Sequence, residues 1–452
     1  MKVLVIGKGG REHALAWRLL KCPSVQHVYV ASGNGGTGVL PGVTNLEAID
    51  GSYPQLAQKA VDLGIGLVVP GPDNVIVDGI QAVFKERGIA CFCPSKAAAE
   101  LEGSKAYAKA FMAKYSIPTA RYQHFQSYPA ARDYIENLAE KVVIKADGLA
   151  AGKGVVLPGD RQEAQRELRE IMLENKFGQD QSVIIEERLY GPEISVLTFC
   201  DGSSFKSLPP GQDHKRIFDG NRGPNTGGMG VYAPVPFVSE AQMQEIDETI
   251  IQPTLEGMKT EGRAFMGMLF TGIMLTQAGP KVLEYNVRFG DPETQTMMLL
   301  IEGDLANLLV ACAEGRLAEE TLEISTGYAC NIVVAAAGYP GPARAGDVIS
   351  IGESFVQQAH LTTTHANSQR HHADDEVDAQ QDAHIFHAGT ALVDGTLRTC
   401  GGRVLSVAAR GSTLEAAVKT AYRTIEAVSF DGMFYRKYIA SEATAEKQKD
   451  GR

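Results

Sequence analysis

Alternating apolar and polar positions mark a strand near the middle of the chain, in KVLEYNVRFGDPETQ at residues 281–295. Successive side chains of a strand point to opposite faces. One face is predicted to pack in the core and consists of Leu283, Tyr285, Val287 and Phe289. The other face consists of Val282, Glu284, Asn286 and Arg288. Next-but-one residues lie about 6.6–7 Å apart, so a carboxylate and an amide oxygen on this face could share one cation. For the segment alone, the alternative is an antiparallel strand with its polar face in water.

The first hundred residues alternate short apolar runs with helical patterns. MKVLVIGKGGREHALAWRLL predicts a strand, a glycine-rich turn and a helix, and further strands are expected at Val28–Ala31, GLVVPGPD and ACFCPS, with helices at Tyr53–Leu63 and Val75–Arg87. This alternation predicts a parallel α/β domain, with ligands at the turns that follow its strands. Glycines before a helix N-terminus suit a phosphate. GKGG lacks the full G-x-G-x-x-G, so a bound nicotinamide is disfavoured, and a turn without any ligand remains open.

Two later stretches combine cations with glycines. KVVIKADGLAAGKGVVL places Lys145 on a strand, followed by a glycine-rich loop with a second cation, Lys153. Such a loop could close over a triphosphate, although a hairpin with exposed lysines is the alternative because no Walker A motif is present. QDHKRIFDGNRGPNTGGMG, from Gln212, gathers an acid, an imidazole, cations and glycines in one short loop, which favours a functional site.

Composition narrows the class of protein. The 452 residues are 44% hydrophobic and 21% charged, as in ordinary soluble proteins of two to four domains. The net charge of −11 and the sequence pI near 5.5 argue against a nucleic-acid surface, so small molecules are the expected partners. The seven cysteines have no metal-ligand or disulfide spacing. With no signal peptide or membrane-spanning run, we expect a cytoplasmic protein with no membrane partner, and a monomer or weak oligomer.

Several long motifs occur in an order that resembles one enzyme family. They are VLVIGKGGREHALAW, VVPGPD, VIKADGLAAGKGVV, EERLYGPEIS, DHKRIFDGNRGPNTGGMG and LEYNVRFGDPETQ, followed by FHAGTAL and GGRVLSV. The chain resembles the phosphoribosylamine–glycine ligases, ATP-grasp enzymes of purine biosynthesis. The resemblance implies that ATP, glycine and 5-phosphoribosylamine are converted to ADP, phosphate and glycinamide ribonucleotide through a glycyl phosphate.

The resemblance also implies roles for individual residues. Glu284 and Asn286 would hold Mg²⁺ or Mn²⁺, because hard cations favour oxygen ligands. Arg288 would hold the glycine carboxylate by a bidentate contact, and Asp213 would receive the glycine ammonium. Together with Lys145, these two residues are the expected catalytic residues.

The remaining implied contacts concern ATP and the amine substrate. ATP would be bound by Lys105, Lys145, Lys153, Glu186, Glu187, Arg188, Leu189, Glu193, Lys215, Arg216 and Asn225. Of these, residues 186–189 would form the hinge under adenine, and Glu193 would contact the ribose. The acyl phosphate would lie against Thr226, Gly227 and Gly228. Phosphoribosylamine would face Gly9, Gly10, Arg11, Pro72 and Asp73.

Three departures from the family pattern limit this transfer. The polar segment at residues 358–383 looks inserted; its histidines invite a metal hypothesis, but a solvated, mobile and dispensable loop is favoured. Tyr438 stands where the family usually has aspartate, and Cys93 replaces a usual glycine. Neither change has a functional explanation from the sequence.

The predicted fold is mixed α/β and α+β. It comprises an N-terminal parallel-sheet domain (1–102), an ATP-grasp core (103–326) with a small lid at about 121–190, a mostly β C-terminal domain (327–440) and a tail (441–452). Two alternatives remain beside the ligase. They are another ATP-grasp carboxylate–amine ligase or carboxylase, against which the DHKR and GPNTGGMG run argues, and a silent nucleotide-binding regulator, which would be expected to lack Glu284, Asn286 or Lys145. An NAD-dependent oxidoreductase ranks last.

Overall fold

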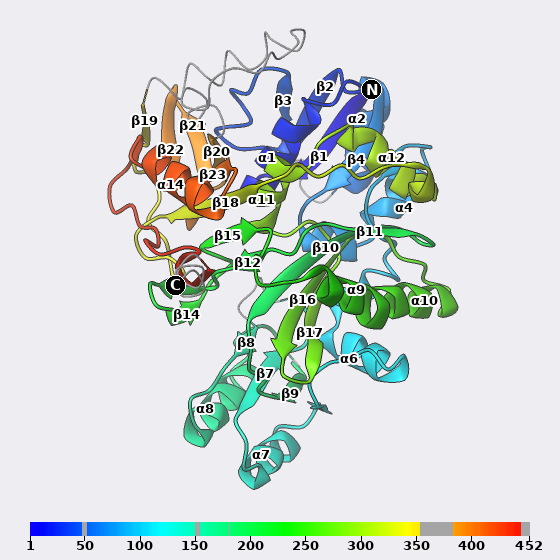
Figure 1. Cartoon of the computed structure of the whole chain (residues 1–452), viewed down its shortest axis with the longest axis vertical. Coiled ribbons are helices and arrows are strands. Elements are labelled where there is room, and N and C mark those ends of the chain that lie inside the picture. Colours follow the sequence, from blue (N-terminus) through cyan, green and yellow to red (C-terminus); the bar gives the residue numbers. More distant parts are fainter. Residues whose placement is uncertain (48–51, 150–153, 180, 353–382, 444–452) are drawn as a thin grey trace.

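The structure is a computed structural model that describes residues 1–47, 52–149, 154–179, 181–352 and 383–443. Four sheets of four or five strands form its framework, with helices packed against their faces (Figure 1). The predicted fold class is confirmed. No helix within the described ranges is long and apolar enough to cross a membrane.

The N-terminal sheet is parallel, as predicted, with the strand order β3-β2-β1-β4-β5. Its strands are β1 (Lys2–Gly7), β2 (His27–Ser32), β3 (Val43–Leu46), β4 (Ile65–Pro70) and β5 (Ala90–Cys91). Its helices are α1 (Gly10–Leu19), α2 (Tyr53–Leu63), α3 (Asp73–Val77) and α4 (Ile80–Lys85). The prediction of one helix over Val75–Arg87 is therefore wrong, because two separate helices, α3 and α4, occupy this stretch. The chain breaks there because Gly79 adopts a φ of +96°, outside helical geometry.

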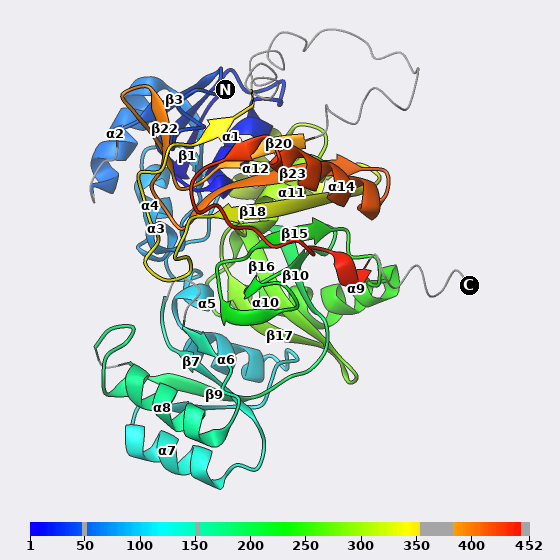
Figure 2. The same cartoon turned by 90° about the vertical axis from the view of Figure 1, so that its left-hand side faces the viewer.

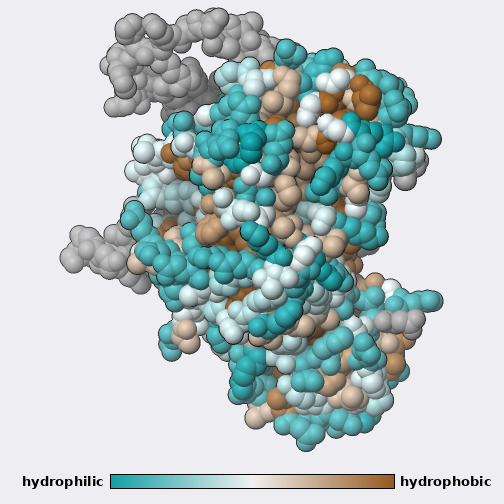
Figure 3. Space-filling model, turned by 90° about the vertical axis from the view of Figure 1, so that its right-hand side faces the viewer, coloured by the Kyte–Doolittle hydropathy of each residue, from teal (hydrophilic) through white to brown (hydrophobic). Residues whose placement is uncertain are grey.

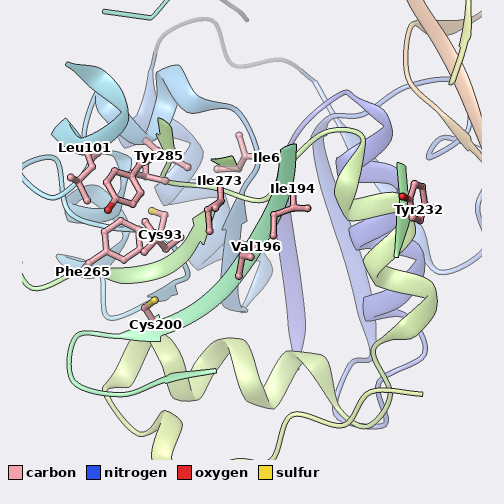
Figure 4. Packing of buried hydrophobic residues seen from close by; sticks show 14 of the residues in the cluster. Ile6, Cys93, Leu101, Ile194, Val196, Cys200, Tyr232, Phe265, Ile273 and Tyr285 are labelled. Atoms are coloured by element: carbon pink, nitrogen blue, oxygen red, sulfur yellow. The ribbon is translucent and has the colours of Figure 1, made fainter. Parts of the chain in front are cut away.

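The central sheet is antiparallel, with the order β11-β10-β16-β17. Its strands are β10 (Glu193–Asp201), β11 (Phe205–Ser207), β16 (Met266–Thr276) and β17 (Gly279–Asn286). Neighbouring helices are α5 (Glu100–Gly103), α6 (Lys105–Lys114), α9 (Glu240–Ile246), α10 (Gln252–Thr260) and α12 (Leu305–Glu314). Figure 4 shows Ile194, Val196, Ile273 and Tyr285 from this sheet in one buried group that extends to Ile6 of β1, so the N-terminal and central sheets share a core.

A bulge in β17 corrects the predicted faces of this strand. Gly272 pairs with Glu284 but Ile273 pairs with Val282, which leaves Leu283 as the extra residue. Val282 is consequently buried in the core, whereas Leu283 lines a cavity. The prediction was wrong for these two residues. Beyond the bulge the alternation holds, because Tyr285, Val287 and Phe289 are buried.

A small antiparallel sheet lies at one end of the molecule, with the order β6-β9-β7-β8. Its strands are β6 (Tyr122–Phe125), β7 (Val142–Ala146), β8 (Val155–Val156) and β9 (Val183–Glu187). Helices α7 (Tyr128–Asn137) and α8 (Arg161–Met172) pack with it around a hydrophobic core of its own. Both Figure 1 and Figure 2 place this unit at the opposite end from the N-terminal and C-terminal sheets.

The C-terminal sheet has the order β12-β15-β18-β23-β20. Its strands are β12 (Gln212–Asp213), β15 (Gly230–Ala233), β18 (Tyr328–Ala335), β20 (Ala383–His387) and β23 (Arg403–Gly411). Helices α11 (Glu293–Leu300) and α14 (Leu414–Ile425) pack on it. Two of the five strands come from before residue 327, so the sheet crosses the predicted domain boundary. The GGMG end of the 212–230 loop therefore continues into the C-terminal sheet.

Two hairpins and a short strand pair complete the structure. The hairpins are β13 (Arg216–Phe218) with β14 (Arg222–Asn225), and β21 (Thr390–Val393) with β22 (Thr396–Thr399). The strand pair is β19 (Ser350–Ile351) with β24 (Val428–Ser429). On the face drawn in Figure 3, hydrophobic residues occur in small groups between hydrophilic ones, as expected for a surface in water.

Candidate active site

A cavity of about 450 Å³ lies where the small sheet, the central sheet and the 212–230 loop meet. Most of the predicted site residues line it. They are Arg11, Pro72, Asp73, Lys105, Lys145, Glu186, Glu187, Arg188, Leu189, Glu193, Asp213, Lys215, Asn225, Thr226, Gly227, Glu284, Asn286 and Arg288. Residues more than 270 positions apart in the sequence thus share one site.

Lys145 connects the small sheet to the central sheet. Its Nζ donates to Leu283 O at 2.7 Å, the carbonyl of the bulge residue, and lies 3.0 Å from Glu186 Oε1. Lys109 Nζ approaches the same carboxylate oxygen at 3.1 Å. Burial outweighs Glu186 and lowers the pKa of Lys109 to about 8. Lys109 was not predicted, although it follows Lys105 by four residues on α6 and so shares a helix face with it.

Lys105 stands at the first turn of α6. Its Nζ donates to Gly148 O at 2.7 Å, and burial lowers its pKa. Asp147 accepts from Ala106 N at 3.1 Å, which ties the chain after β7 to the same helix end. The N-terminus of α6, Lys105 and Lys145 therefore create one region of positive potential, which suits a polyphosphate.

The two predicted metal ligands lie on one face of β17, after the bulge. Burial would raise the pKa of Glu284, but Lys215, Lys145 and Lys105 outweigh it, so the net pKa is lowered and the carboxylate is ionised at neutral pH. Asn286 Oδ1 accepts from Arg288 Nη2 at 2.9 Å. Within the described ranges there is no cluster of three or more His, Cys, Asp or Glu able to hold a metal. The side-chain oxygens of Glu284 and Asn286 are donors of the kind that Mg²⁺ takes when it is held jointly with substrate phosphates and water.

Arg288 is held by a buried acid that the sequence did not reveal. Its Nη2 lies 3.0 Å from Glu102 Oε1, and Glu102 Oε2 accepts from Val287 N at 2.7 Å. Burial opposes the charge of Arg288, but Glu102 and Asp73 raise its pKa overall. Arg288 thus remains charged, with its fork fixed by α5 and β17.

Asp213 and Glu293 place a pair of carboxyl groups in the wall of the cavity. Burial, and next the Glu293 charge, raise the pKa of Asp213 well above its ordinary value. Burial likewise raises the pKa of Glu293. Asp213 Oδ1 has no hydrogen-bond partner among the described residues. A pair of this kind suits a bound ammonium group, which would supply both the missing donor and a compensating charge.

Lys215 bridges the 212–230 loop to the central sheet. Its Nζ contacts Glu193 Oε1 and lies 3.8 Å from Glu284 Oε1. Burial opposes its charge, but Glu193 and Glu284 raise its pKa.

Arg403, from the C-terminal sheet, is a further residue that sequence analysis missed. Its Nη1 donates to Gly227 O at 2.5 Å and to Asp291 O at 2.8 Å, and its Nη2 lies 3.1 Å from Asp291 Oδ2. The hydroxyl of Tyr339 accepts from Gly227 N at 3.0 Å. The C-terminal sheet therefore holds the glycine-rich loop in place.

Four of the predicted residues that the structure describes lie outside the cavity lining. Gly9 N donates to Glu12 Oε2 at 2.5 Å, and Gly9 lines an adjacent cavity of about 620 Å³ that shares Asp291 and Arg403 with the first. Gly10 packs against Gln295, where a Cβ would lie 2.6 Å from Nε2. Arg216 donates to Gly223 O at 2.6 Å and so braces its own hairpin.

Gly228, the fourth, has a φ of +108° and lies beside Asp213, whose Oδ1 would be 2.8 Å from a Cβ at this position. It therefore borders the acid pair rather than the cavity itself.

The departures from the family pattern have separate outcomes. Tyr438 is 60% exposed and does not line either cavity. Cys93 is buried, with its Sγ 3.6 Å from Cys91 Sγ. Lys153 and the predicted insertion, apart from Ala383 in β20, lie outside the described residues.

Comparison with known proteins matches most of the chain to one family. Three models of phosphoribosylglycinamide synthetase match: the N domain at residues 1–102, the ATP-grasp (A) domain at 103–294 and the C domain at 329–442. The bifunctional purine biosynthetic protein ADE1 of Schizosaccharomyces pombe is 47% identical over 99% of this chain, which spans 54% of that relative. A phosphoribosylamine–glycine ligase of Escherichia coli O6:H1 is 42% identical over 99% of this chain and 100% of its own length. The chain thus spans about half the length of the fungal bifunctional relatives.

Solved structures show the same architecture. The crystal structure of phosphoribosylamine–glycine ligase from Thermotoga maritima has a TM-score of 0.78 and 35% identity, covering 97% of this chain and 99% of its own. The biotin carboxylase domain of a Hydrogenobacter thermophilus 2-oxoglutarate carboxylase has a TM-score of 0.68 at 15% identity, covering 96% of this chain and 91% of its own, and shares the fold alone.

Proposed function

The chain belongs to the phosphoribosylglycinamide synthetase family, and from that premise we propose that it ligates glycine to 5-phosphoribosylamine at the expense of ATP. The products are glycinamide ribonucleotide, ADP and phosphate. The observation that carries the proposal is the convergence of Glu284, Asn286 and Arg288 with four lysines in one cavity. Such a set can bind a metal-bound triphosphate and a carboxylate side by side.

In this proposal ATP lies between the small sheet and the central sheet. The backbone of residues 186–189 offers donors and acceptors to adenine, and Glu193 accepts from the ribose hydroxyls. Lys105 and Lys145 bind phosphate oxygens. Glu284 and Asn286 would hold Mg²⁺ or Mn²⁺, which when bound neutralises charge developing between the β- and γ-phosphates.

The glycine site then lies between Arg288 and the acid pair. The Arg288 fork holds the glycine carboxylate, and Asp213 and Glu293 receive the ammonium group, because Asp213 Oδ1 lacks a partner among the described residues. In the first step a carboxylate oxygen attacks the γ-phosphorus and ADP leaves. In the second the amine of phosphoribosylamine attacks the acyl carbon, phosphate leaves and the amine loses a proton. Positioning supplies most of the rate enhancement in such a site.

An assay of ADP release with substrate omission tests the reaction. With ATP, Mg²⁺, glycine and freshly generated phosphoribosylamine, ADP should form continuously, and leaving out either glycine or the amine should reduce the rate to background. Mass spectrometry should find glycinamide ribonucleotide in step with ADP. ADP release that is equally fast without glycine would overturn the proposed reaction.

A further inference from the structure

His214 lies between Asp213 and Lys215 but is not among the residues that line the cavity. Its Nε2 accepts a hydrogen bond from Ala440 N at 3.2 Å, and its Nδ1 is 3.2 Å from Gly230 O. Because a backbone N–H only donates, Nε2 carries no proton and Nδ1 donates to Gly230 O. Burial, followed by the Arg436 charge, lowers the pKa of His214 to about 4. The neutral ring thus joins the site loop to residue 440 near the end of the described chain.

Arg436 makes the second connection to the same loop. Its side chain is buried, and its Nη1 donates to Arg216 O and its Nη2 to Asn221 Oδ1, both at 3.1 Å. Lys437 N donates to Asp219 Oδ1 at 2.9 Å. One buried guanidinium therefore contacts strand β13 and the turn of the β13–β14 hairpin. Its Nη1 and Nη2 groups meet oxygen acceptors, whereas its Nε lies 4.0 Å from Asp219 Oδ1 and has no hydrogen-bond partner among the described residues.

The segment that carries Arg436 is itself firmly anchored. Phe434 and Ala335 exchange backbone hydrogen bonds at 3.0 and 2.7 Å, which fixes the segment to β18. The hydroxyl of Tyr422, on α14, donates to Arg436 O at 2.8 Å and accepts from Ile439 N at 3.0 Å. The C-terminal sheet and its helix thus hold the segment on one side while the segment holds the hairpin on the other.

The hairpin that Arg436 holds is connected directly to residues that line the cavity. The hairpin is continuous with Lys215, whose O accepts from Thr226 N at 2.8 Å and whose Nζ contacts Glu193. We infer that residues 434–440 are a positioning segment for the ATP and glycine sites, with Arg436 and His214 as positioning residues that set Lys215 and Asp213. This inference rests on the proposed function for the identity of the two ligands.

Replacing Arg436 by methionine tests the role, because methionine keeps the apolar length and removes every donor. Arg344 provides a matched control: it belongs to the same C-terminal part but contacts Asp347 and Asp431 instead of the hairpin. Arg436→Met should raise the KM values for ATP and glycine roughly tenfold or more, as expected for displaced binding groups, and leave the KM for phosphoribosylamine unchanged. Arg344→Met should leave all three KM values unchanged.

A direct binding measurement separates this inference from the proposed reaction. Titration calorimetry with Mg²⁺–ATP should show weaker binding by Arg436→Met than by the wild type or Arg344→Met, whatever the acceptor substrate is. If the wild type bound ATP but showed no glycine-dependent turnover, the proposed function would fail. The comparison of ATP affinities by calorimetry would still test the positioning role of residues 434–440. Wild-type ATP affinity and KM values in folded Arg436→Met would overturn the inference.

Tyr422→Phe keeps the test decisive if Arg436→Met does not fold. It removes one oxygen that holds both Arg436 O and Ile439 N, so the same two KM values should rise by a smaller factor. An equal loss of kcat with every KM unchanged would indicate a merely structural role and would also overturn the inference.

Discussion

Arg288 forms an ion pair with the buried Glu102 and also lines the cavity, so a substitution at this residue tests the proposed glycine site. Arg288→Lys keeps the charge but loses the planar fork that meets Glu102 and Asn286. We expect glycine KM to rise and kcat to fall, each by about tenfold or more, with ATP affinity nearly unchanged. Steady-state kinetics with each substrate varied in turn measures this.

The control for Arg288 is Arg410→Lys, which alters a β23 arginine that faces Glu302 at 3.6 Å. It should leave all kinetic constants unchanged. If Arg288→Lys instead lost ATP binding with glycine KM intact, Arg288 would be a polyphosphate residue, and the glycine site would lie around Asp213 and the glycine-rich loop.

Glu284→Ala removes one of the two proposed metal ligands and the carboxylate that balances three lysines. A catalytic metal contributes several kcal/mol of transition-state stabilisation, so turnover should fall about a hundredfold or more. Circular dichroism should be unchanged, because the carboxylate is part of a cavity wall rather than the core. Wild-type turnover at saturating Mg²⁺ would rule out the ligand role.

At the residue scale, the sequence predicted the polar face of β17 correctly from Glu284 onward and failed at Val282 and Leu283. Alternation assumes an unbroken ladder, and a bulge depends on the partner strand, which the local pattern does not contain. Glu102 and Arg403 were missed for a related reason: each reaches the site only through tertiary packing. Lys109 could have been found from its helical spacing to Lys105.

At the scale of elements, the glycine-rich loop offers a test with an internal control. Gly228 has a φ of +108°, and a Cβ there would lie 2.4 Å from Pro292 Cδ and 2.8 Å from Asp213 Oδ1. Gly220 also has a positive φ, +68°, but its nearest neighbour would be 3.8 Å away. Gly228→Ala should therefore lower kcat/KM for glycine roughly a hundredfold, and Gly220→Ala should change it little. Equal effects of the two substitutions would show that backbone strain alone is responsible.

The contact between α1 and β20 predicts a pH dependence of stability. His13 lies 5.5 Å from His387 between ring centroids, and Trp17 lies 4.3 Å from His384. Burial lowers the pKa of His387 to about 4 and that of His384 to about 3, the latter with help from Lys21. Burial, and then His387, also lower the pKa of His13. These folded-state values lie below the unfolded value of about 6.5, so the unfolded chain binds more protons in between, and stability falls as the pH drops below about 6.5.

For His387 alone, the loss at pH 5 should be about 2 kcal/mol in the free energy of unfolding. Trp17 is the only tryptophan, so its fluorescence during urea unfolding reports on this contact. His387→Gln should reduce the difference in unfolding free energy between pH 7 and pH 5 by about that amount. An unchanged difference in His387→Gln would contradict the assignment.

At the scale of the whole molecule, the order of elements was more predictable than their partners. Short apolar runs and helical patterns were sufficient to predict the parallel N-terminal sheet, because each of its units is local in sequence. The C-terminal sheet was assigned wholly to residues after 327, yet β12 and β15 join it. Pairing across such sequence distances leaves no local signal. Arg403 of this sheet and the segment 434–440 also form hydrogen bonds to the 212–230 loop. The C-terminal part of the chain therefore helps to position the site.

The small sheet meets this assembly at the cavity where ATP is proposed to bind, which makes ATP itself a predicted brace. It has its own hydrophobic core, and Lys145 links it to the central sheet through Leu283 O at 2.7 Å. A ligand that contacts both units adds a stabilisation of about 2.7 kcal/mol at a hundred times its Kd.

Hydrogen exchange of Val142–Ala146 and residues 186–189 should therefore slow when a non-hydrolysable ATP analogue and Mg²⁺ are added, while exchange of Lys2–Gly7 stays constant. Lys145→Met should weaken this protection at equal nucleotide concentration. Unchanged exchange of the small sheet, with calorimetry showing the nucleotide bound, would place ATP elsewhere and would remove the basis for the adenine hinge at residues 186–189.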